Sequence, residues 1–197
     1  MAHGQENIKK PNVSGQFYPS DPKELSGQID SFFNKASVEP MDGRVEMLIA
    51  PHAGYVYSGP VAAYGYKAAS RSSYKTVVVI AASHHVGFSG ASVWAQGKLE
   101  TPLGPVEVDT DFAQKVIDGN KEFAFIPKVF EKEHSLEVQL PFLQKTFTGF
   151  KIVPIIMGQP TFKTCQDLAK ALDSIIADRT DVLVVISTDM SHYHSAK

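Results

Sequence analysis

The segment Thr-Val-Val-Val-Ile-Ala-Ala, residues 76–82, carries the strongest structural signal in the chain. It is apolar at consecutive positions and rich in β-branched side chains, which is typical of a strand buried on both faces of a parallel sheet. Similar short apolar runs occur at residues 45–50, 151–157 and 182–187. Segments with apolar residues at helical spacing, such as 164–176, lie between them. This alternation predicts an α/β fold with a mainly parallel or mixed sheet and helices on both faces.

Local signals refine this architecture. Ser58-Gly59-Pro60 predicts the start of a helix that runs to about Ala69. Pro141 lies inside an apolar helical stripe, so that helix must kink or restart there. The less regular segment 87–108 is expected to contribute an antiparallel hairpin. The strand at 182–187 is the last along the chain, and we expect it at an end of the sheet.

The bulk composition restricts the class of protein. The chain has 197 residues, 43% hydrophobic and 20% charged, so one domain over residues 1–197 is expected. The net charge of −2, with Lys and Arg scattered, offers no basic patch for nucleic acid or an anionic membrane. No apolar run approaches the ~20 residues that span a bilayer, and the N-terminus lacks a signal-peptide pattern. The single cysteine, Cys165, excludes an intrachain disulfide, and we expect a cytoplasmic protein.

Histidines follow three of the predicted strands, and one more opens the apolar helical stripe. They are His52 after the first run, His84 and His85 after the second, His192 and His194 after the last, and His134 at the stripe. In open α/β sheets, ligands bind at the carboxyl ends of the strands. Any single histidine is more often a surface or hydrogen-bonded core residue, and His3 and His194 are assigned to that class. The joint placement of the others favours a shared site.

Such a cluster suits metal binding or proton transfer. Neutral imidazole is a common ligand for Zn, Fe and Cu, and it is also the usual general acid or base near neutral pH. Asp189 can orient an imidazole or take a coordination position, but it can equally be a loop residue that caps its own backbone. The sequence has no phosphate-binding glycine loop and no nucleophile elbow. Cys165 is predicted to be a buried small hydrophobe rather than a nucleophile.

Five motifs, in order along nearly the whole chain, carry a family resemblance. They are Gly15-Gln16-Phe17-Tyr18-Pro19, Ala50-Pro51-His52-Ala53-Gly54-Tyr55, Ser83-His84-His85, Glu133-His134-Ser135-Leu136-Glu137 and Ser187-Thr188-Asp189-Met190-Ser191-His192. These motifs resemble the Memo family, whose prokaryotic members are called AmmeMemoRadiSam system protein B. The family is similar in structure to the class III extradiol dioxygenases, which use non-haem Fe(II) to cleave catechol rings.

The resemblance implies roles for individual residues. His52 and His84 match positions that carry metal in the family. His134 and His192 match histidines of the same pocket, where the dioxygenases have acid/base residues, and Asp189 matches a pocket carboxylate. Fe(II) is therefore the expected cofactor, with Cu or Zn as alternatives. His85 has no matched role, and as the extended neighbour of His84 it is expected to point the other way.

One feature departs from the family pattern. Family chains usually continue past the Asp-x-x-His motif, and a later segment supplies a cysteine that completes the metal site. This sequence ends at Lys197, and Cys165 does not match that cysteine. The resemblance therefore implies that a C-terminal segment of full-length relatives is absent here. We expect the two metal histidines alone to bind metal weakly.

Three functional hypotheses follow. The first is a non-haem iron-dependent oxidoreductase of dioxygenase type that acts on a small molecule, with His134 or His192 moving protons. The second is a module that binds a peptide or a partner protein, including partners of the AmmeMemoRadiSam system, in the same cleft without turnover. The third is a Zn hydrolase. The substrate cannot be read from the sequence, because a fold does not fix the chemistry that it carries.

Overall fold

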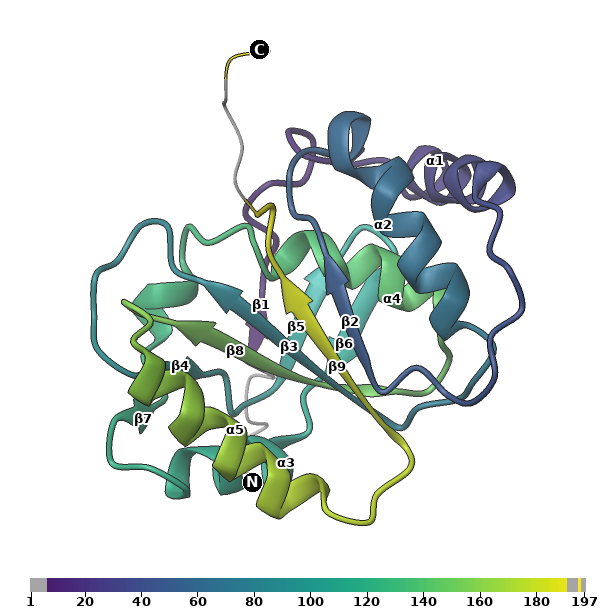
Figure 1. Ribbon diagram of the computed structural model, residues 1–197. Coiled ribbons are helices and arrows are strands. Elements are labelled where there is room, and N and C mark those ends of the chain that lie inside the picture. Colours follow the sequence, from purple (N-terminus) through teal and green to yellow (C-terminus); the bar gives the residue numbers. More distant parts are fainter. Residues whose placement is uncertain (1–6, 191–194, 196–197) are drawn as a thin grey trace, which may run out of the picture.

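The computed structural model describes residues 7–190 and residue 195. Its main sheet has six strands in the order β2-β9-β3-β8-β4-β7 (Figure 1). The strands are β2 Met47–Ala50, β9 Val182–Ser187, β3 Thr76–Ala82, β8 Lys151–Met157, β4 Ala91–Val93 and β7 Phe123–Ala124. The first four are parallel, whereas β4 runs antiparallel to β8 and parallel to β7. The predicted mainly parallel sheet is confirmed.

A second, smaller sheet flanks the first. It has the order β1-β5-β6, from β1 Ile8–Lys9, β5 Lys98–Thr101 and β6 Gly104–Glu107. Strands β5 and β6 form the antiparallel hairpin that was expected in the irregular segment. The expectation that β9 ends the main sheet was wrong. It lies between β2 and β3, because the crossovers insert this last strand between two earlier ones.

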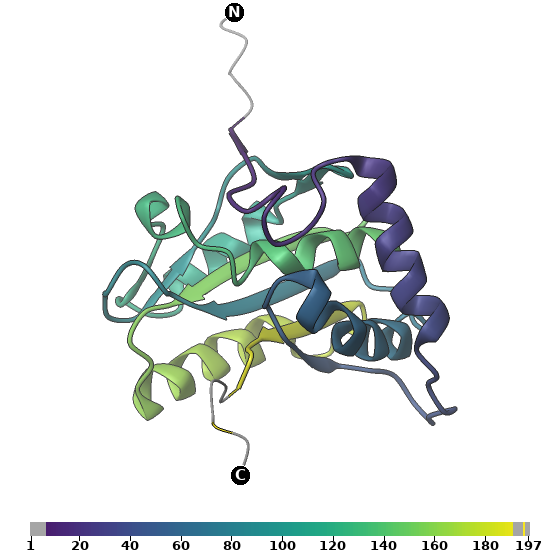
Figure 2. The same cartoon turned by 90° about the horizontal axis from the view of Figure 1, so that it is seen from above.

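Helices cover both faces of the main sheet (Figures 1 and 2). One layer holds α1 Pro22–Lys35, α2 Tyr55–Ala69 and α4 Leu140–Thr146, and the other holds α3 Thr110–Asp118 and α5 Phe162–Ile176. Successive side chains of β2 point to opposite faces of the sheet and meet helices of different layers. A Cβ atom on Gly65 of α2 would lie 2.3 Å from Leu48 Cδ1, whereas Met47 lines a cavity together with Leu172 of α5. The predicted helical cover on both faces is confirmed.

Helix α2 begins earlier than Ser58-Gly59-Pro60 predicted. The carbonyl of Gly54 accepts hydrogen bonds from the N–H groups of Tyr57 and Ser58, at 2.8 and 3.1 Å. The first helical turn is therefore already formed before Pro60, which lies inside the helix. The Ser58 hydroxyl donates to the carbonyl of Ala53 (2.8 Å) rather than capping its own helix. This early start draws the chain after His52 sharply away from the strand.

Around Pro141 the chain restarts its helix, as predicted. Two short 3-10 helices, η1 Pro127–Phe130 and η2 Glu137–Gln139, precede α4, and Pro141 lies in the first turn of α4. Proline is tolerated there because the first N–H groups of a helix have no partner within the helix. In the described part of the chain, no helix is long and apolar enough to cross a membrane.

Candidate metal centre

The three predicted strand ends lie side by side at one edge of the main sheet. Ser187, at the end of β9, pairs with Ala50 of β2 on one side and with Ala81 of β3 on the other. Because these strands are parallel, the loops that follow them leave the sheet at the same edge. His52, His84 and Asp189 lie in those loops, so the predicted convergence is present in the fold.

The segment 133–135 brings His134 to the same edge. The hydroxyl of Ser135 donates to the carbonyl of Ala82 at the end of β3 (3.0 Å). In turn, the Ser187 hydroxyl at the end of β9 donates to the carbonyl of Ser135 (2.6 Å). These two hydrogen bonds tie the segment to two neighbouring strands. His134 is thereby held above the sheet edge next to His52 and His84.

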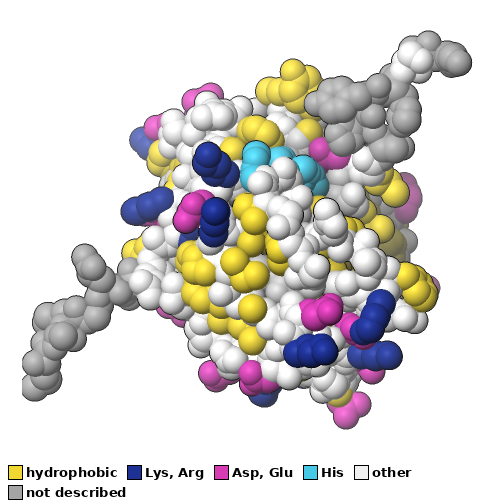
Figure 3. All heavy atoms as spheres, turned by 90° about the vertical axis from the view of Figure 1, so that its left-hand side faces the viewer, with side chains coloured by type: hydrophobic (Ala, Val, Ile, Leu, Met, Phe, Trp, Pro, Cys, Tyr) yellow, Lys and Arg dark blue, Asp and Glu magenta, His cyan; other side chains and the backbone are white. Residues whose placement is uncertain are grey.

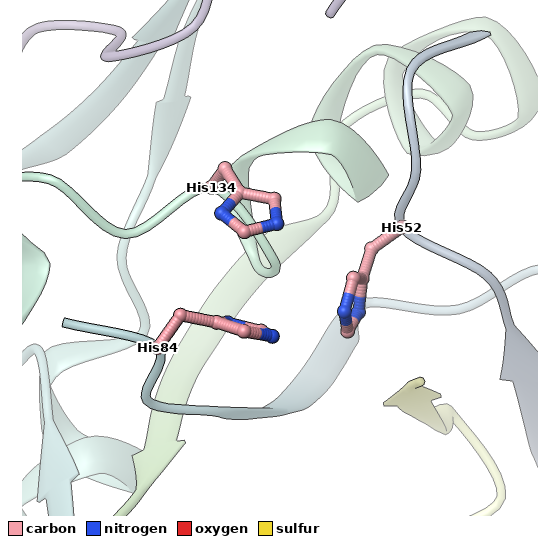
Figure 4. A group of neighbouring side chains, drawn as sticks. All are labelled: His52, His84 and His134. Atoms are coloured by element: carbon pink, nitrogen blue, oxygen red, sulfur yellow. The ribbon is translucent and has the colours of Figure 1, made fainter. Parts of the chain in front are cut away.

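The rings of His52, His84 and His134 point toward one another (Figure 4). Each ring offers one nitrogen to a group whose three ligand atoms all lie within 4.8 Å of one another. Nitrogen ligands of a tetrahedral zinc ion lie about 2.0–2.1 Å from the metal and hence about 3.4 Å apart. Rotations of the rings about their side-chain bonds would be needed to bring the three nitrogens to that spacing. The donor set and its spacing therefore fit a single transition-metal ion.

Glu133 holds the ring of His84 in place. The carboxylate accepts the Nδ1–H of His84 at 2.9 Å and the backbone N–H of the same residue at 2.6 Å. The Glu133 side chain is 1% exposed, whereas that of His84 is 39% exposed. An ionised carboxylate only accepts hydrogen bonds, so the His84 proton sits on Nδ1. The lone pair of neutral His84 is therefore on Nε2, and this pairing is the usual outer-shell arrangement of a metal-binding histidine.

His134 lies between the same carboxylate and an aromatic ring. Its Nδ1 atom is 3.5 Å from Glu133 Oε1, and its ring centroid is 4.8 Å from that of Phe17. Its backbone N–H also donates to Glu133, at 3.0 Å. One buried carboxylate thus holds the ring of His84 and the backbone of His134. Phe17, from the first sequence motif, packs against the outer side of the group.

Asp189 caps the loop that carries His52. One of its carboxylate oxygens accepts the backbone N–H groups of His52 and Ala53. The other oxygen lies 3.9 Å from His52 Nε2. Asp189 therefore caps a neighbouring loop instead of its own backbone, and it places a carboxylate oxygen at the border of the histidine group.

Burial keeps the centre ready to bind a cation. It lowers the pKa of His52 and of His134, while the nearby carboxylates Asp189 and Glu133 oppose that effect. Burial alone would raise the pKa of Glu133, but hydrogen bonds from His84 and Ser135 outweigh it and lower this pKa to about 2. His52 and His134 are therefore neutral at pH 7, with free lone pairs, beside a carboxylate that stays ionised.

Three further sequence predictions meet the structure differently. His192 lies outside the described residues, so its role stays a prediction. His85 is not among the three clustered ligands. Its side chain lines a different cavity from that of His84, which agrees with the expectation that the two neighbouring side chains point in opposite directions. Cys165 was expected to be buried but is exposed, because it lies at the margin of the buried face of α5, beside an open cavity.

Two cavities border the centre. One, of about 630 Å³, extends from His52 and His84 along the α5 side of the sheet and is largely apolar. The other, of about 600 Å³, reaches His134 and Phe17 from the opposite side. Figure 3 shows histidine side chains gathered at one place on the surface, beside a broad hydrophobic area. Ligands can thus approach the three rings from solvent.

Sequence reasoning missed the residues that support the histidines. Glu133, Gln139 and Ser187 received no role, although Glu133 and Ser187 stood in the quoted motifs. The available signal was a carboxylate directly before His134 in sequence. Glu133 acts mainly on His84, and that contact spans 49 residues and exists only after folding.

Comparison with known proteins agrees with the motif resemblance. The sequence model of the family described as Memo-like protein matches residues 9–196. A MEMO1 family protein of Thermotoga maritima is 40% identical over 202 aligned residues, which span 96% of this chain and 72% of the relative. One from Caldivirga maquilingensis is 39% identical, spanning 94% and 69% of the two chains. One from Saccharolobus solfataricus is 40% identical, spanning 93% and 69%.

The match extends across both sheets and both helical layers, and it includes every loop that contributes to the histidine group. The chain is about 40% identical to family proteins of three organisms over more than nine-tenths of its length, so the resemblance is not confined to short motifs. With the five motifs in their places around one sheet edge, this chain belongs to the Memo family.

Proposed function

We propose that His52, His84 and His134 bind one metal ion through their ring nitrogens. The observation that carries the proposal is the convergence of one nitrogen from each of three imidazoles within 4.8 Å, with the ring of His84 oriented by the buried carboxylate of Glu133. Without a cation, packing three imidazoles together would add little to the stability of the fold. The rings tolerate this proximity only while they are neutral. The sequence had assigned His134 to proton transfer, and the geometry supports a ligand role for it equally well.

For the metal we propose Fe(II). Imidazole ligands suit Fe, Cu and Zn, and two histidines with a carboxylate are the donors of non-haem Fe(II) oxygenases. Asp189 supplies such a carboxylate at the border of the site. Bound iron would act as a Lewis acid that polarises and orients a substrate. The chain's own residues would position that substrate in the adjoining cavity and hold a proton on His134. This makes the protein an oxidoreductase of extradiol-dioxygenase type.

Elemental analysis and oxygen uptake test this function together. Protein purified without added metal is analysed for bound metals, loaded anaerobically with Fe(II), and then exposed to oxygen with a series of catechols. Uptake that requires iron, and that is lost in His84→Ala but kept in His85→Ala, supports the proposal. Substrate hydrolysis with Zn²⁺ and no oxygen dependence would replace it with the hydrolase. Metal-free binding of peptides with no turnover would replace it with a recognition module.

The affinity for metal should depend on pH in a defined direction. A ligating imidazole must be neutral, and protons compete with the metal at each ring. Burial lowers the pKa of His52 and of His134, so protons compete with the metal at these two rings only below the ordinary ~6.5. Below that pH the affinity should fall steeply, as protons add to the rings. Titration calorimetry with Zn²⁺ at several pH values measures this.

Asp189→Asn is the matched control for that pH profile. Asparagine keeps an oxygen that can accept the backbone N–H groups of His52 and Ala53 but removes the negative charge. We expect the variant to keep a steep acid limb that moves to lower pH, because the charge of Asp189 no longer raises the pKa of His52. A profile that stayed flat down to about pH 5 in the wild type would mean that carboxylates, not imidazoles, dominate the coordination.

A further inference from the structure

The Nδ1 atom of His52 contacts a buried chain of hydrogen bonds that the metal proposal does not use. The Ser187 hydroxyl oxygen lies 3.0 Å from His52 Nδ1. The same oxygen lies 2.6 Å from the carbonyl oxygen of Ser135 and 2.8 Å from the amide nitrogen of Gln139. All four residues are buried, with exposed fractions between 0% and 5%. Each proton in this series of hydrogen bonds must therefore have its acceptor inside the protein.

The Ser187 hydroxyl has one proton and two lone pairs. The carbonyl of Ser135 can only accept, and at 2.6 Å the two oxygens need a proton between them, so the Ser187 proton points there. Toward its other two neighbours, the Ser187 oxygen can then only accept. One of these neighbours is His52 Nδ1. That nitrogen must donate, which places a proton on Nδ1.

Contacts of Gln139 with Pro51 and Tyr66 fix the orientation of its side-chain amide independently of Ser187. Its amide nitrogen also lies 2.9 Å from the carbonyl oxygen of Pro51, a group that can only accept. Its amide oxygen accepts the hydroxyl proton of Tyr66 at 2.7 Å. Burial raises the pKa of Tyr66, so this hydroxyl keeps its proton. The Gln139 amide must therefore present its N–H to Ser187, which occupies one of the two lone pairs of that oxygen.

We infer that Ser187, itself fixed by Gln139 and Tyr66, is a positioning residue that holds His52 in the tautomer with its proton on Nδ1. The lone pair of neutral His52 then lies on Nε2, the nitrogen on the side of Asp189 Oδ2. This is the tautomer that Glu133 imposes on His84, reached through neutral partners instead of a carboxylate. The use of that lone pair rests on the proposed metal site, but the tautomer is a property of the metal-free chain.

Nitrogen NMR of the metal-free protein tests the tautomer directly. Protein labelled with ¹⁵N-histidine is measured at about pH 7.5, where the buried ring is neutral, and the His52 signals are identified by their absence in His52→Gln. Protonated and unprotonated ring nitrogens resonate in well-separated ranges. We expect Nδ1 in the protonated range and Nε2 in the unprotonated range. The reverse pattern in the wild type overturns the inference, whatever the protein does with metals.

Substitutions at Ser187 then test the cause. Ser187→Ala removes the acceptor that the described part of the chain offers to the Nδ1 proton, and it should move the His52 signals toward the other tautomer. Ser187→Thr keeps a hydroxyl on the strand and should restore the wild-type pattern. Ser92→Ala is the control, because Ser92 is a buried hydroxyl on β4 of the same sheet whose hydrogen bonds, within the described residues, go to Ile126. A wild-type pattern in Ser187→Ala overturns the inference.

Metal affinity separates this inference from the function on which it rests. If the site binds metal, Ser187→Ala should weaken Zn²⁺ binding by about 10- to 100-fold, as losses of outer-shell partners typically do. Ser187→Thr and Ser92→Ala should bind like the wild type. A wild type that shows the expected tautomer but binds no metal would remove the proposed function and leave the inference in place. Unchanged affinity in Ser187→Ala, despite an altered tautomer, would remove the positioning role.

Discussion

Replacing His52 or His84 by alanine is expected to reduce metal affinity by more than about 100-fold, since loss of an outer-shell partner alone costs 10- to 100-fold. Each ring supplies one of the three nitrogens that meet within 4.8 Å. Among the residues that the structure describes, no other histidine belongs to the group, and His85 lines the other cavity. The measurement is anaerobic calorimetric titration of Fe(II), with bound metal counted after desalting.

His85→Ala is the matched control for this experiment, since it removes a histidine from the same loop. It should bind metal like the wild type. Thermal unfolding of each variant checks that the loss is local, because His52 is 5% exposed and its removal leaves a cavity. Equal loss of affinity in all three variants, with folding intact, would contradict the assignment, as would equal retention.

His134→Ala separates the two roles that remain open for this residue. As a third ligand, His134 should contribute to affinity as strongly as His52 does. As a proton carrier, it should leave the affinity nearly unchanged and lower only turnover. The lowered pKa of the His134 ring suits both roles, because a neutral imidazole can bind metal or accept a proton.

Sequence reasoning reached the fold because its strongest signals are local. The runs at 76–82, 151–157 and 182–187 are strands with these same bounds, since buried parallel strands are apolar on both faces and stop where polar residues begin. Strand order carries no such signal. The place of β9 between β2 and β3 depends on which crossovers pack best, and this information is spread over the whole chain.

The same division applies to the site. His52 and His84 could be grouped from the sequence, because parallel strands deliver their loops to one edge. The residues that orient the histidine rings could not be identified from the sequence. Ser187 meets His52 across 135 residues, and Gln139 meets Ser187 across 48. Ser187 and Gln139 are residue types found throughout cores and surfaces, and only the folded contacts distinguish them.

Glu133→Gln is expected to lower the free energy of unfolding by about 3 kcal/mol at pH 7, because removing one partner of a buried charged network leaves the others unsatisfied. The Glu133 carboxylate accepts N–H groups of His84, His134 and Ser135 and is 1% exposed. A glutamine can keep an oxygen at the position of Oε1 for the His84 ring, His134 and Ser135, but its NH2 group then faces the backbone N–H of His84. The ring of His84 would have a neutral acceptor instead of a carboxylate, so metal affinity should fall as well.

The pH dependence of stability gives the sharper readout. The pKa of Glu133 is about 2 in the folded protein, against 4.5 for the free group. A depressed folded pKa means that the stabilisation is complete above about pH 4.5 and is lost as the pH falls toward about 2, a change of about 3 kcal/mol. Urea unfolding at several pH values in this range should show the loss of unfolding free energy in the wild type. In Glu133→Gln, the unfolding free energy should depend less on pH, because this carboxylate is absent.

Glu131→Gln controls for the removal of one negative charge, since Glu131 is exposed and lies two residues away. It should unfold like the wild type at every pH. Other carboxylates with lowered pKa values, such as Asp181, titrate in all three proteins and cancel in the comparison. If Glu133→Gln kept both the stability and the acid slope of the wild type, the carboxylate would not be the anchor of the histidine loops. The orientation of His84 and His134 would then need a different cause.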